Sequence, residues 1–380
     1  MSIMATVFLF LIILSTLVVV HEWGHFATAK KFGMRVHEFG VGFPPRAIGF
    51  YRDPATKKIV WIKSREPTTY PATVYSLNWL PLGGFCKIKG ENGEEAGQSD
   101  SFGFQAWWKR IIVLVAGVGM NVVLAGALLS IGLTIGIPTD VSLGIPKGAI
   151  VVEPPAVVAQ EVLKRSPAAE GGIAFGDKIL FIDDRAVVGS SEFIEYVSRH
   201  GDQDITLRVR RGTEERSVTL RPRPLIEGEA PKLGIVLADA AVIRYPWYRA
   251  LPQGALSAIV GLGNIFVAVY ILVKNLILGQ GLAFDVSGPV GIAGVVGASA
   301  KLGIHYLINV TAMVSLSLAA MNILPIPALD GGRVLFVLIE KIFRRPVPMK
   351  YEQAAHTIGF ILLLILVVVV TGRDVLGLIR

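Results

Sequence analysis

The sequence predicts a multi-span α-helical membrane protein with four core transmembrane helices, and three observations support this. The 380 residues are 52% hydrophobic and only 17% charged, whereas soluble domains carry about 25% charged residues. The mean hydropathy is +0.58. Long apolar runs recur along the chain, as expected for helices that cross ~30 Å of hydrocarbon.

Four segments are candidates for the spans. The first apolar run is uninterrupted from Met4 to Val20. It has no basic stretch before it and is too long for the core of a signal peptide, so we expect an uncleaved span. With their flanking residues, the predicted transmembrane helices comprise residues 1–32, 107–138, 304–332 and 354–376.

Polar segments separate these spans. Residues 33–106 are rich in turns and contain short alternating pieces at 57–63 and 85–91, which predict strands. Residues 141–240 form a block that resembles a soluble domain, and residues 333–353 are expected to form a loop. We therefore expect a β-region after the first helix and an inserted α+β domain after the second.

The distribution of basic residues predicts the orientation in the membrane. Lys and Arg are frequent between the first two spans and again in the loop after the third, while none precedes the first span. Cytoplasmic loops are enriched in Lys and Arg. This places both basic segments in the cytoplasm and the N-terminus and residues 141–240 outside. The net charge of +8 follows this pattern and does not indicate nucleic-acid binding.

The stretch VVVHEWGHFATAK, at residues 18–30, places ionisable side chains at the inner end of the first span. His21 and His25 are four residues apart, so a helix presents both on one face, where they can bind zinc. Glu22 beside them could accept a proton from a zinc-bound water. The only cysteine, Cys86, excludes a site built on paired cysteines. Short matches of this kind also arise by chance, but ionisable groups in an apolar span usually mark function.

A catalytic zinc ion usually has three protein ligands. The third span runs inward and carries Asp330 near its inner end, at a depth similar to that of His21 and His25. His305 begins the same span and is therefore too distant. His356, near the start of the fourth span, remains an alternative. We expect Asp330 to be the third ligand of a single catalytic zinc ion.

Pro325 and Pro327 predict a break in the third span, because neither can donate a backbone hydrogen bond within a helix. Irregular backbone at membrane depth is tolerated where it lines a cavity or is buried in protein. The break therefore marks the candidate site and could expose backbone groups to an extended substrate. An ordinary proline kink is the alternative.

Three motifs together carry a family resemblance: HEWGH at residues 21–25, YSLNWLPLGGFCKIKGE at residues 75–91 and NILPIPALDGG at residues 322–332. In this order they resemble the site-2 protease family of intramembrane zinc metalloproteases, in particular its bacterial branch typified by the regulator-of-sigma-E protease. The resemblance implies a single zinc ion, bound by two histidines and an aspartate, and Glu22 as catalytic base. It further implies that Asn322 positions the substrate, and that residues 33–106 are associated with the membrane. Gly117 and Asn121 match a G-x-x-x-N motif of the second span, and we expect them, like Asn322, Pro325 and Pro327, to take part in substrate binding.

Residues 141–240 resemble a PDZ domain of the type found in such proteases. Strands are expected at 178–183, 204–211 and 216–222, and a helix at 190–200. The strand near Gly234 could bind a peptide. A domain that only excludes bulky substrates is the alternative.

The sequence thus predicts an intramembrane zinc metalloendopeptidase of the bacterial inner membrane. Its expected partners are the lipid bilayer and a single-pass transmembrane substrate, such as an anti-sigma factor after a first cleavage. One alternative is a catalytically silent membrane scaffold whose PDZ domain binds partners, and a more distant one is a metal-ion carrier. Neither requires a base at Glu22.

Residues 247–303 pose a problem of parity. The 24 residues between Arg249 and Lys274 carry no formal charge and are long enough to span. A single crossing there would reverse the direction of the third span and place Asp330 on the side opposite His21. The return segment, residues 286–300, is short and rich in glycine. We therefore expect an interfacial or partly re-entrant helix on the outer side, with Pro252 near its start.

Overall fold

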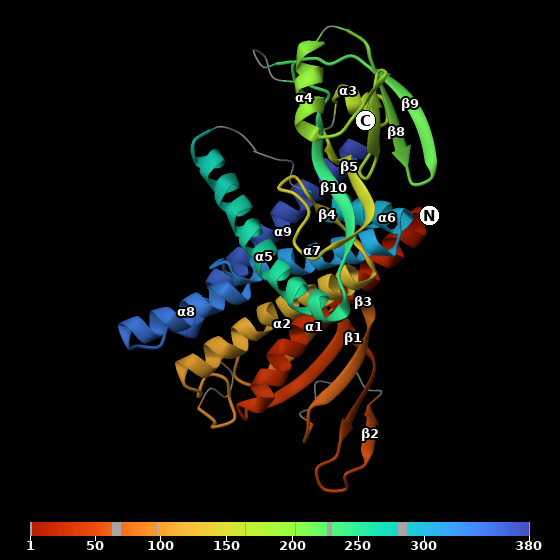
Figure 1. The fold of residues 1–380 in the computed structure, drawn as a ribbon. Coiled ribbons are helices and arrows are strands. Elements are labelled where there is room, and N and C mark those ends of the chain that lie inside the picture. Colours follow the sequence, from red (N-terminus) through yellow and green to blue (C-terminus); the bar gives the residue numbers. More distant parts are fainter. Residues whose placement is uncertain are drawn as a thin grey trace. The chain divides into compact units, whose positions relative to one another are not determined.

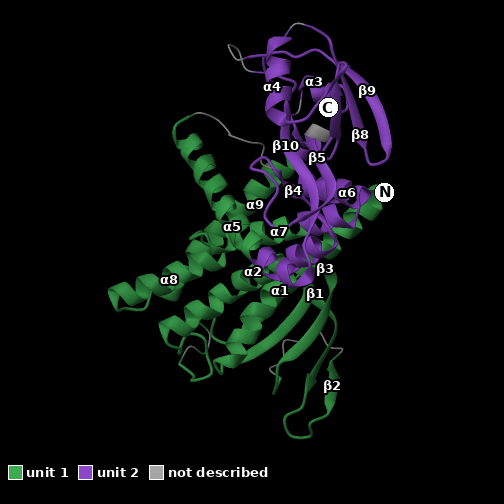
Figure 2. Ribbon diagram, in the orientation of Figure 1, with its two compact units in different colours: residues 1–126, 256–279, 311–372 green, residues 127–255, 280–310, 373–380 purple. Residues whose placement is uncertain are grey.

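The computed structural model describes residues 2–62, 70–93, 95, 97–163, 165–201, 203–225, 230–279 and 287–379. They form two compact units, each assembled from separate stretches of the chain (Figures 1 and 2). Unit 1 comprises residues 1–126, 256–279 and 311–372, and unit 2 comprises residues 127–255, 280–310 and 373–380. The helix with both candidate histidines belongs to unit 1, and the inserted block belongs to unit 2.

Long apolar helices form the frame of unit 1. Ser2 caps the first of them, because its Oγ accepts a hydrogen bond from the amide of Ala5. Unit 1 contains all or part of α1 (Ile3–Lys31), α2 (Trp107–Ile135), α5 (Trp247–Ile277), α7 (Ile304–Ile323), α8 (Asp330–Phe343) and α9 (Met349–Ile379). A buried core joins α1, α2 and α8 to the adjacent sheet, through residues that include Phe26, Val36, Val113 and Val337.

The sheet of unit 1 has three antiparallel strands in the order β2-β1-β3. They are β1 (Val36–Arg52), β2 (Ile59–Ile62) and β3 (Val74–Ile88). Ser15 joins α1 to β3, because its Oγ donates to the carbonyl of Pro81 and accepts from the amide of Gly83. The strands predicted at 57–63 and 85–91 correspond to β2 and to the end of β3, with residue 63 outside the described residues.

A second antiparallel sheet forms the centre of unit 2, in the order β4-β10-β5-β6-β8-β9, with β7 paired to β6. Its strands are β4 (Ile137–Asp140), β5 (Ile150–Val162), β6 (Lys178–Ile182), β7 (Arg185–Ala186), β8 (Ile205–Arg211), β9 (Glu214–Leu220) and β10 (Ile235–Arg244). The predicted strands at 178–183, 204–211 and 216–222 are confirmed as β6, β8 and β9.

Two short helices pack with this sheet: α3 (Pro167–Glu170) and α4 (Ser190–Arg199). The helix predicted at 190–200 is confirmed as α4. It is amphipathic, since Phe193 and Val197 are four residues apart and both are buried in the core with Ile179 and Leu207. Alternating apolar residues of the strands supply the rest of this core.

Five helices among the described residues are long and apolar enough to cross a membrane: α1, α2, α5, α7 and α9. This is one more than the four core helices predicted. The additional helix is α5, which continues for 31 residues with Pro252 in its second turn. The next helix, α6 (Pro289–Leu302), has 14 residues and would span only ~21 Å. Five apolar helices make the chain a multi-pass membrane protein.

The third predicted span ends earlier than expected. The predicted break is confirmed: α7 ends at Ile323, and a new helix begins at Asp330. Between them Ala328 has a φ of 80°, a left-handed conformation that helices do not contain. The structure also differs from the expected loop at 333–353, since α8 continues to Phe343. The reason is an apolar face on α8 that packs into the core of unit 1, where Val337 is 2% exposed.

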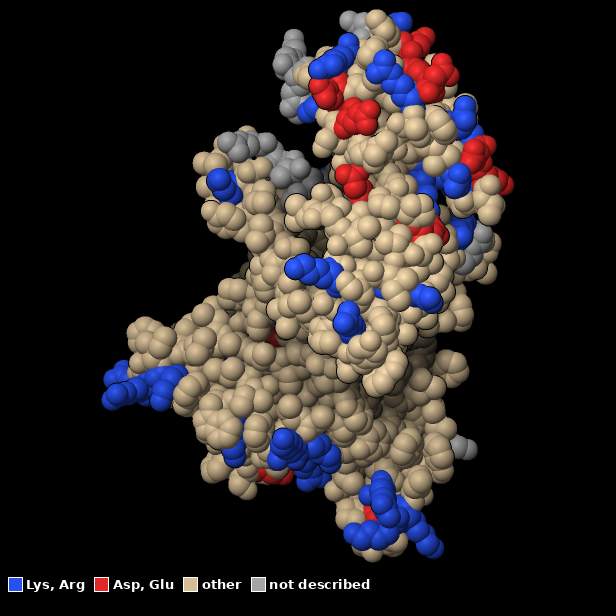
Figure 3. Space-filling view, in the orientation of Figure 1, with Lys and Arg blue, Asp and Glu red and all other residues tan. Residues whose placement is uncertain are grey.

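Charged side chains of unit 1 gather at its periphery (Figure 3). Lys341, Arg344 and Arg345 are exposed at the end of α8, and Lys57 and Lys58 are exposed at the turn between β1 and β2. A further group of Lys and Arg side chains lies between these two in the view, and the rest of the visible surface of unit 1 consists mainly of uncharged residues (Figure 3). This is the distribution expected where basic residues flank an apolar, lipid-facing surface.

Candidate functional site

The sixth and seventh turns of α1 carry the candidate histidines. His21 and His25 lie one turn apart, so the helix presents both rings on the same face, with 6% and 7% of each residue exposed. Their Nε2 atoms are 3.1 Å apart. A carboxylate oxygen of Glu22 and one ring nitrogen from each histidine lie within 4.8 Å of one another. The local sequence therefore brings a pair of metal-binding nitrogens next to a carboxylate.

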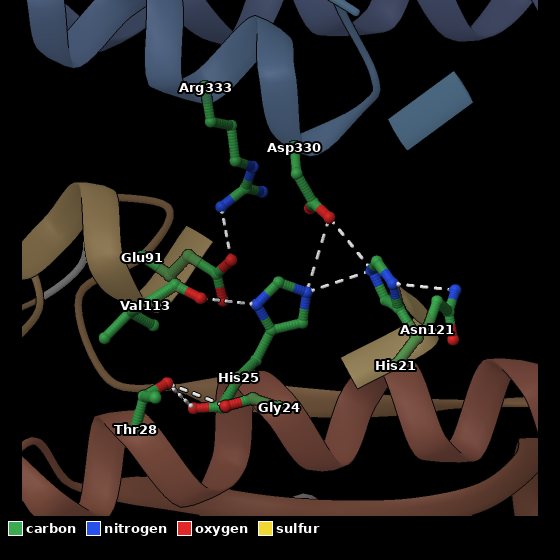
Figure 4. Close-up of polar contacts among 9 residues, drawn as sticks. All are labelled: His21, Gly24, His25, Thr28, Glu91, Val113, Asn121, Asp330 and Arg333. Atoms are coloured by element: carbon green, nitrogen blue, oxygen red, sulfur yellow. Dashed lines mark hydrogen bonds and ion pairs between the residues drawn. The ribbon is translucent and has the colours of Figure 1, made fainter. Parts of the chain in front are cut away.

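Asp330 completes this cluster from a distant part of the chain (Figure 4). It is the first residue of α8, and its Oδ2 lies 2.9 Å from His21 Nε2 and 3.4 Å from His25 Nε2. The structure thus places together the two histidines and the aspartate that the sequence analysis singled out. It does not bring His356 to the histidines.

The three donor atoms fit a zinc ion. Zinc–nitrogen and zinc–oxygen bonds of about 2.0–2.2 Å in tetrahedral geometry separate neighbouring ligand atoms by roughly 3.3 Å. The separations between His21 Nε2, His25 Nε2 and Asp330 Oδ2 are 2.9, 3.1 and 3.4 Å. Two neutral imidazoles and one carboxylate are also a donor set that zinc enzymes use, with the fourth position open.

Two glycines allow α1 and α2 to approach closely enough to enclose the cluster. A Cβ atom on Gly24 would lie 2.4 Å from the carbonyl oxygen of Ala116, and a Cβ on Gly117 would lie 2.5 Å from His25 Nε2 and 2.7 Å from His21 Nε2. Both distances are below any normal contact. A side chain at Gly117 would therefore occupy the space in which the two histidine nitrogens meet.

The loop before α8 holds Asp330 in place. A Cβ on Gly331 would come within 2.2 Å of the carbonyl oxygens of Ile323 and Leu324, so α8 folds back tightly against the end of α7. On α9, His356 Nδ1 accepts a hydrogen bond from the amide of Ala328 at 2.8 Å. The histidine that was an alternative zinc ligand thus supports the loop that leads to Asp330.

Two ion pairs attach α8 to other parts of unit 1, and sequence reasoning did not find them. Arg333 Nη1 contacts Glu91 Oε1 at 2.5 Å, one turn after Asp330 (Figure 4). Arg110 Nη1 contacts Glu340 Oε2 at 2.6 Å. The two residues of the first pair are 242 positions apart in the sequence, and those of the second pair are 230 positions apart. Spacing within a motif therefore gives no signal for them.

The remaining candidate residues lie on α2 and at the end of α7 and the loop that follows it. Gly117 and Asn121 are buried on α2, where Asn121 Nδ2 is 3.4 Å from His21 Nδ1. Asn322 is half-buried on the last turn of α7, and Pro325 and Pro327 lie in the loop between α7 and α8. The polar contacts drawn around the histidines involve Asn121 but none of the latter three residues (Figure 4).

Comparison with known proteins gives a consistent assignment. Residues 9–366 match Peptidase family M50. A protein of Clostridium perfringens is 33% identical over 367 residues, which are 96% of this chain and 97% of its relative. A second relative from Clostridium acetobutylicum is 31% identical and covers 94% of each chain, and a third from Fusobacterium nucleatum is 31% identical and covers 96% of each. Their names assign all three provisionally to the zinc metalloproteases.

Among solved structures, this chain is similar to the PDZ domain of an SdrC-like protein from Listeria innocua. The alignment covers 22% of this chain and 92% of that domain, with 26% sequence identity and a TM-score of 0.20. The family match and the curated relatives, in contrast, extend over nearly the whole chain. The chain belongs to peptidase family M50, the site-2 protease family of intramembrane proteases, and is a zinc metalloprotease.

Proposed function

We propose that this metalloprotease cleaves a transmembrane segment of a single-pass membrane protein near the cytoplasmic face. The observation that carries the proposal is the convergence of His21, His25 and Asp330, next to Glu22, on helices of a membrane-spanning unit. Ionisable groups are costly at membrane depth and are retained there for function. A cluster of zinc ligands beside a carboxylate that can act as a base is the arrangement that zinc-dependent peptide hydrolysis uses.

In this proposal His21, His25 and Asp330 hold the zinc ion, and Glu22 is the general base. When bound, zinc would polarise the scissile carbonyl and lower the pKa of a water ligand to about 7. Glu22 removes a proton from the water whose oxygen attacks the carbonyl carbon. It then delivers that proton to the amide nitrogen as the carbon–nitrogen bond breaks. The products are a carboxylic acid and an amine.

The substrate must lose its helical structure at the site of cleavage, because a helix uses its peptide carbonyls in internal hydrogen bonds. The interruption between α7 and α8 supports such a step, since Pro325 and Pro327 carry no amide proton. We propose that this irregular backbone receives the extended substrate and that Asn322, at the adjoining end of α7, helps to position it.

We further propose that the protein lies in the bacterial inner membrane with its N-terminus and residues 141–240 outside. The basic residues at the end of α8 and at the β1–β2 turn support this orientation. An anti-sigma factor that has undergone a first cleavage is a substrate of the proposed kind. Large exposed apolar side chains on the unit 1 sheet, including Phe43, Trp61, Leu77 and Trp79, support association of residues 33–106 with the membrane.

Residues 141–240 are proposed to be a PDZ domain that controls access to the site. The order of strands and the position of α4 match the elements expected from the sequence. The segment of β10 near Gly234 pairs with β5 on one edge, whereas β4 occupies the other edge only at residues 240–243. Among the described residues, no strand pairs with this second edge at residues 235–239. We propose that this stretch receives a peptide strand, and exclusion of bulky substrates is the alternative use of the domain.

Removing this domain is expected to change selectivity and preserve chemistry. Asp140 on β4 and Ala240 on β10 are register partners, so a short turn can replace residues 141–239. We expect this variant to cleave a bare transmembrane peptide at near-normal rates and to accept substrates with bulky outer domains that the intact protein rejects. Rates are measured for both substrates in vesicles. The same replacement combined with Glu22→Gln is the control, and a folded variant without any activity would contradict this role.

The membrane position of α5 can be tested by side-specific labelling. We expect cysteines at Lys274 or Leu278, in a Cys86→Ala background, to react with an impermeant thiol reagent from outside, because an outer interfacial or re-entrant helix keeps both positions on that side. Gln280 would be a further test position, six residues after Lys274, but it lies outside the described residues. Cysteines at the exposed Lys57 and Glu195 serve as inner and outer controls. Reaction only from the cytoplasm would require a five-span or six-span topology.

The proposed function competes with a silent membrane scaffold and a metal-ion carrier. Reconstitution of the purified protein with a single-pass reporter distinguishes them, because only a protease produces two fragments. We expect a chelator to abolish cleavage and zinc to restore it, with the cut mapped by mass spectrometry to the cytoplasmic half of the reporter helix. An intact reporter in the presence of the zinc-loaded protein would favour one of the alternatives.

A further inference from the structure

One face of α2 contacts both histidines of the candidate zinc site. Val113, Gly117 and Asn121 follow one another at intervals of four residues and therefore lie along one stripe of the helix. All three lie next to the histidine pair. Val113 contacts His25 and Asn121 contacts His21, whereas Gly117 faces the point at which the two Nε2 atoms meet. Figure 4 shows Val113 and Asn121 on opposite sides of the two rings.

The contact with Val113 determines which nitrogen of His25 carries hydrogen. His25 Nδ1 lies 2.8 Å from the carbonyl oxygen of Val113, in a buried position. A carbonyl oxygen only accepts hydrogen bonds, so Nδ1 must be the donor. In the neutral ring, Nε2 is then the nitrogen with a free lone pair, and this atom points toward His21 and Asp330. The backbone of α2 thus selects the tautomer of His25 that a metal at Nε2 needs.

Asn121 occupies the equivalent position for His21. Its side chain is fully buried, with Nδ2 at 3.4 Å from His21 Nδ1, and its Oδ1 has no hydrogen-bond partner among the described residues. Buried amide oxygens are rarely left without a donor. Rotation of the terminal amide exchanges Oδ1 and Nδ2. Oδ1 would then face His21 Nδ1 and accept a hydrogen bond from its N–H, which gives the oxygen the donor that it lacks.

We propose that Asn121 is a positioning residue that accepts a hydrogen bond from His21 Nδ1–H and so directs the lone pair of Nε2 toward the zinc ion. This inference rests on the proposed zinc site. Histidine ligands in proteins commonly donate their second ring N–H to such an acceptor, which fixes the tautomer and the orientation of the ring. The G-x-x-x-N spacing then has a physical explanation. Gly117 leaves room for the two Nε2 atoms, and Asn121, one helical turn later, provides the hydrogen-bond acceptor for His21 Nδ1–H.

The surroundings of Asn121 favour this role over direct contact with a substrate. The residue is 0% exposed, and Ser315 Oγ on α7 donates to its backbone carbonyl at 2.8 Å. A side chain enclosed between two helices and a histidine ring is poorly placed to contact a passing polypeptide. Its amide reaches the candidate site through its contact with His21 Nδ1.

The test measures zinc affinity of the purified full-length protein in detergent, by competition with a calibrated chelator. The Asn121→Leu variant retains the approximate volume and removes the acceptor, and its dissociation constant for zinc is expected to rise about 10- to 100-fold. Asn121→Asp retains an acceptor and should bind zinc within a few-fold of the original protein. Ser315→Ala is the matched control, because it removes a buried hydrogen bond to the same residue and leaves the amide in place.

The proposal would be overturned if the Asn121→Leu variant bound zinc as tightly as the original protein. It would also be overturned if Asn121→Leu and Ser315→Ala lost the same amount of zinc affinity. If Asn121→Leu does not fold, nitrogen NMR of histidine-labelled original protein gives an independent result. The proposal requires protonated Nδ1 and zinc-bound Nε2 at both His21 and His25, and protonated Nε2 at His21 would refute it. Failure of the original protein to bind zinc through these histidines would instead refute the proposed function.

Discussion

Replacement of Glu22 by glutamine is expected to reduce cleavage about 10²- to 10⁴-fold, while the protein keeps its zinc. Glutamine has nearly the same size and still forms hydrogen bonds, but it cannot accept the proton of the attacking water. The ligand atoms of His21, His25 and Asp330 are unchanged in this variant. Cleavage of a single-pass reporter and the metal content of the purified protein are measured together.

Glu195→Gln is a matched control for this substitution, because it makes the same chemical change at an exposed position of α4. It should cleave the reporter at the normal rate. Near-normal turnover by Glu22→Gln would remove Glu22 from the mechanism. Loss of zinc from Glu22→Gln would show that the carboxylate acts as a ligand.

Asp330→Ala is expected to lose both activity and zinc. The substitution removes one of three ligands and leaves two histidines, so the dissociation constant should rise by more than the about 10- to 100-fold that outer hydrogen bonds contribute. Reporter cleavage should fall to background. Metal analysis after dialysis against a weak chelator, together with the cleavage rate, measures the effect.

His356→Ala is the informative comparison for Asp330→Ala, since His356 is the alternative third ligand. In the structure its Nδ1 binds the amide of Ala328, so its loss should loosen the loop before α8 and leave zinc bound. We expect a folded His356→Ala variant with nearly normal metal content. Release of zinc from this variant, with full retention in Asp330→Ala, would show that the third ligand has been assigned incorrectly.

Sequence reasoning succeeded where the information is local. His21 and His25 fall on one face because a helix repeats every 3.6 residues, and Pro325 and Pro327 interrupt a helix wherever they occur in its interior. The predicted break between α7 and α8 was therefore confirmed. The proximity of Asp330 to the histidines followed from membrane depth, which both spans share.

The contacts that organise the site were not predictable in the same way. The carbonyl of Val113 and the Glu91–Arg333 ion pair depend on how distant segments pack, and nothing in their local sequences reports that packing. α8 was missed because its basic residues were interpreted as a loop, whereas burial of Val337 and neighbouring apolar residues stabilises a helix. Hydropathy also left α5 ambiguous, since length and composition alone do not distinguish a spanning helix from an interfacial one.

Proteomics of membrane fragments tests the central claim most directly. Cells that contain the original protein are compared with cells that contain Glu22→Gln at the same level, and peptides that end inside predicted transmembrane segments are quantified. We predict that a small set of such fragments, cut near the cytoplasmic ends of single-pass proteins, is present with the original protein and absent with Glu22→Gln. Identical fragment sets in both cell populations would contradict the assignment of this chain as an intramembrane protease that uses Glu22.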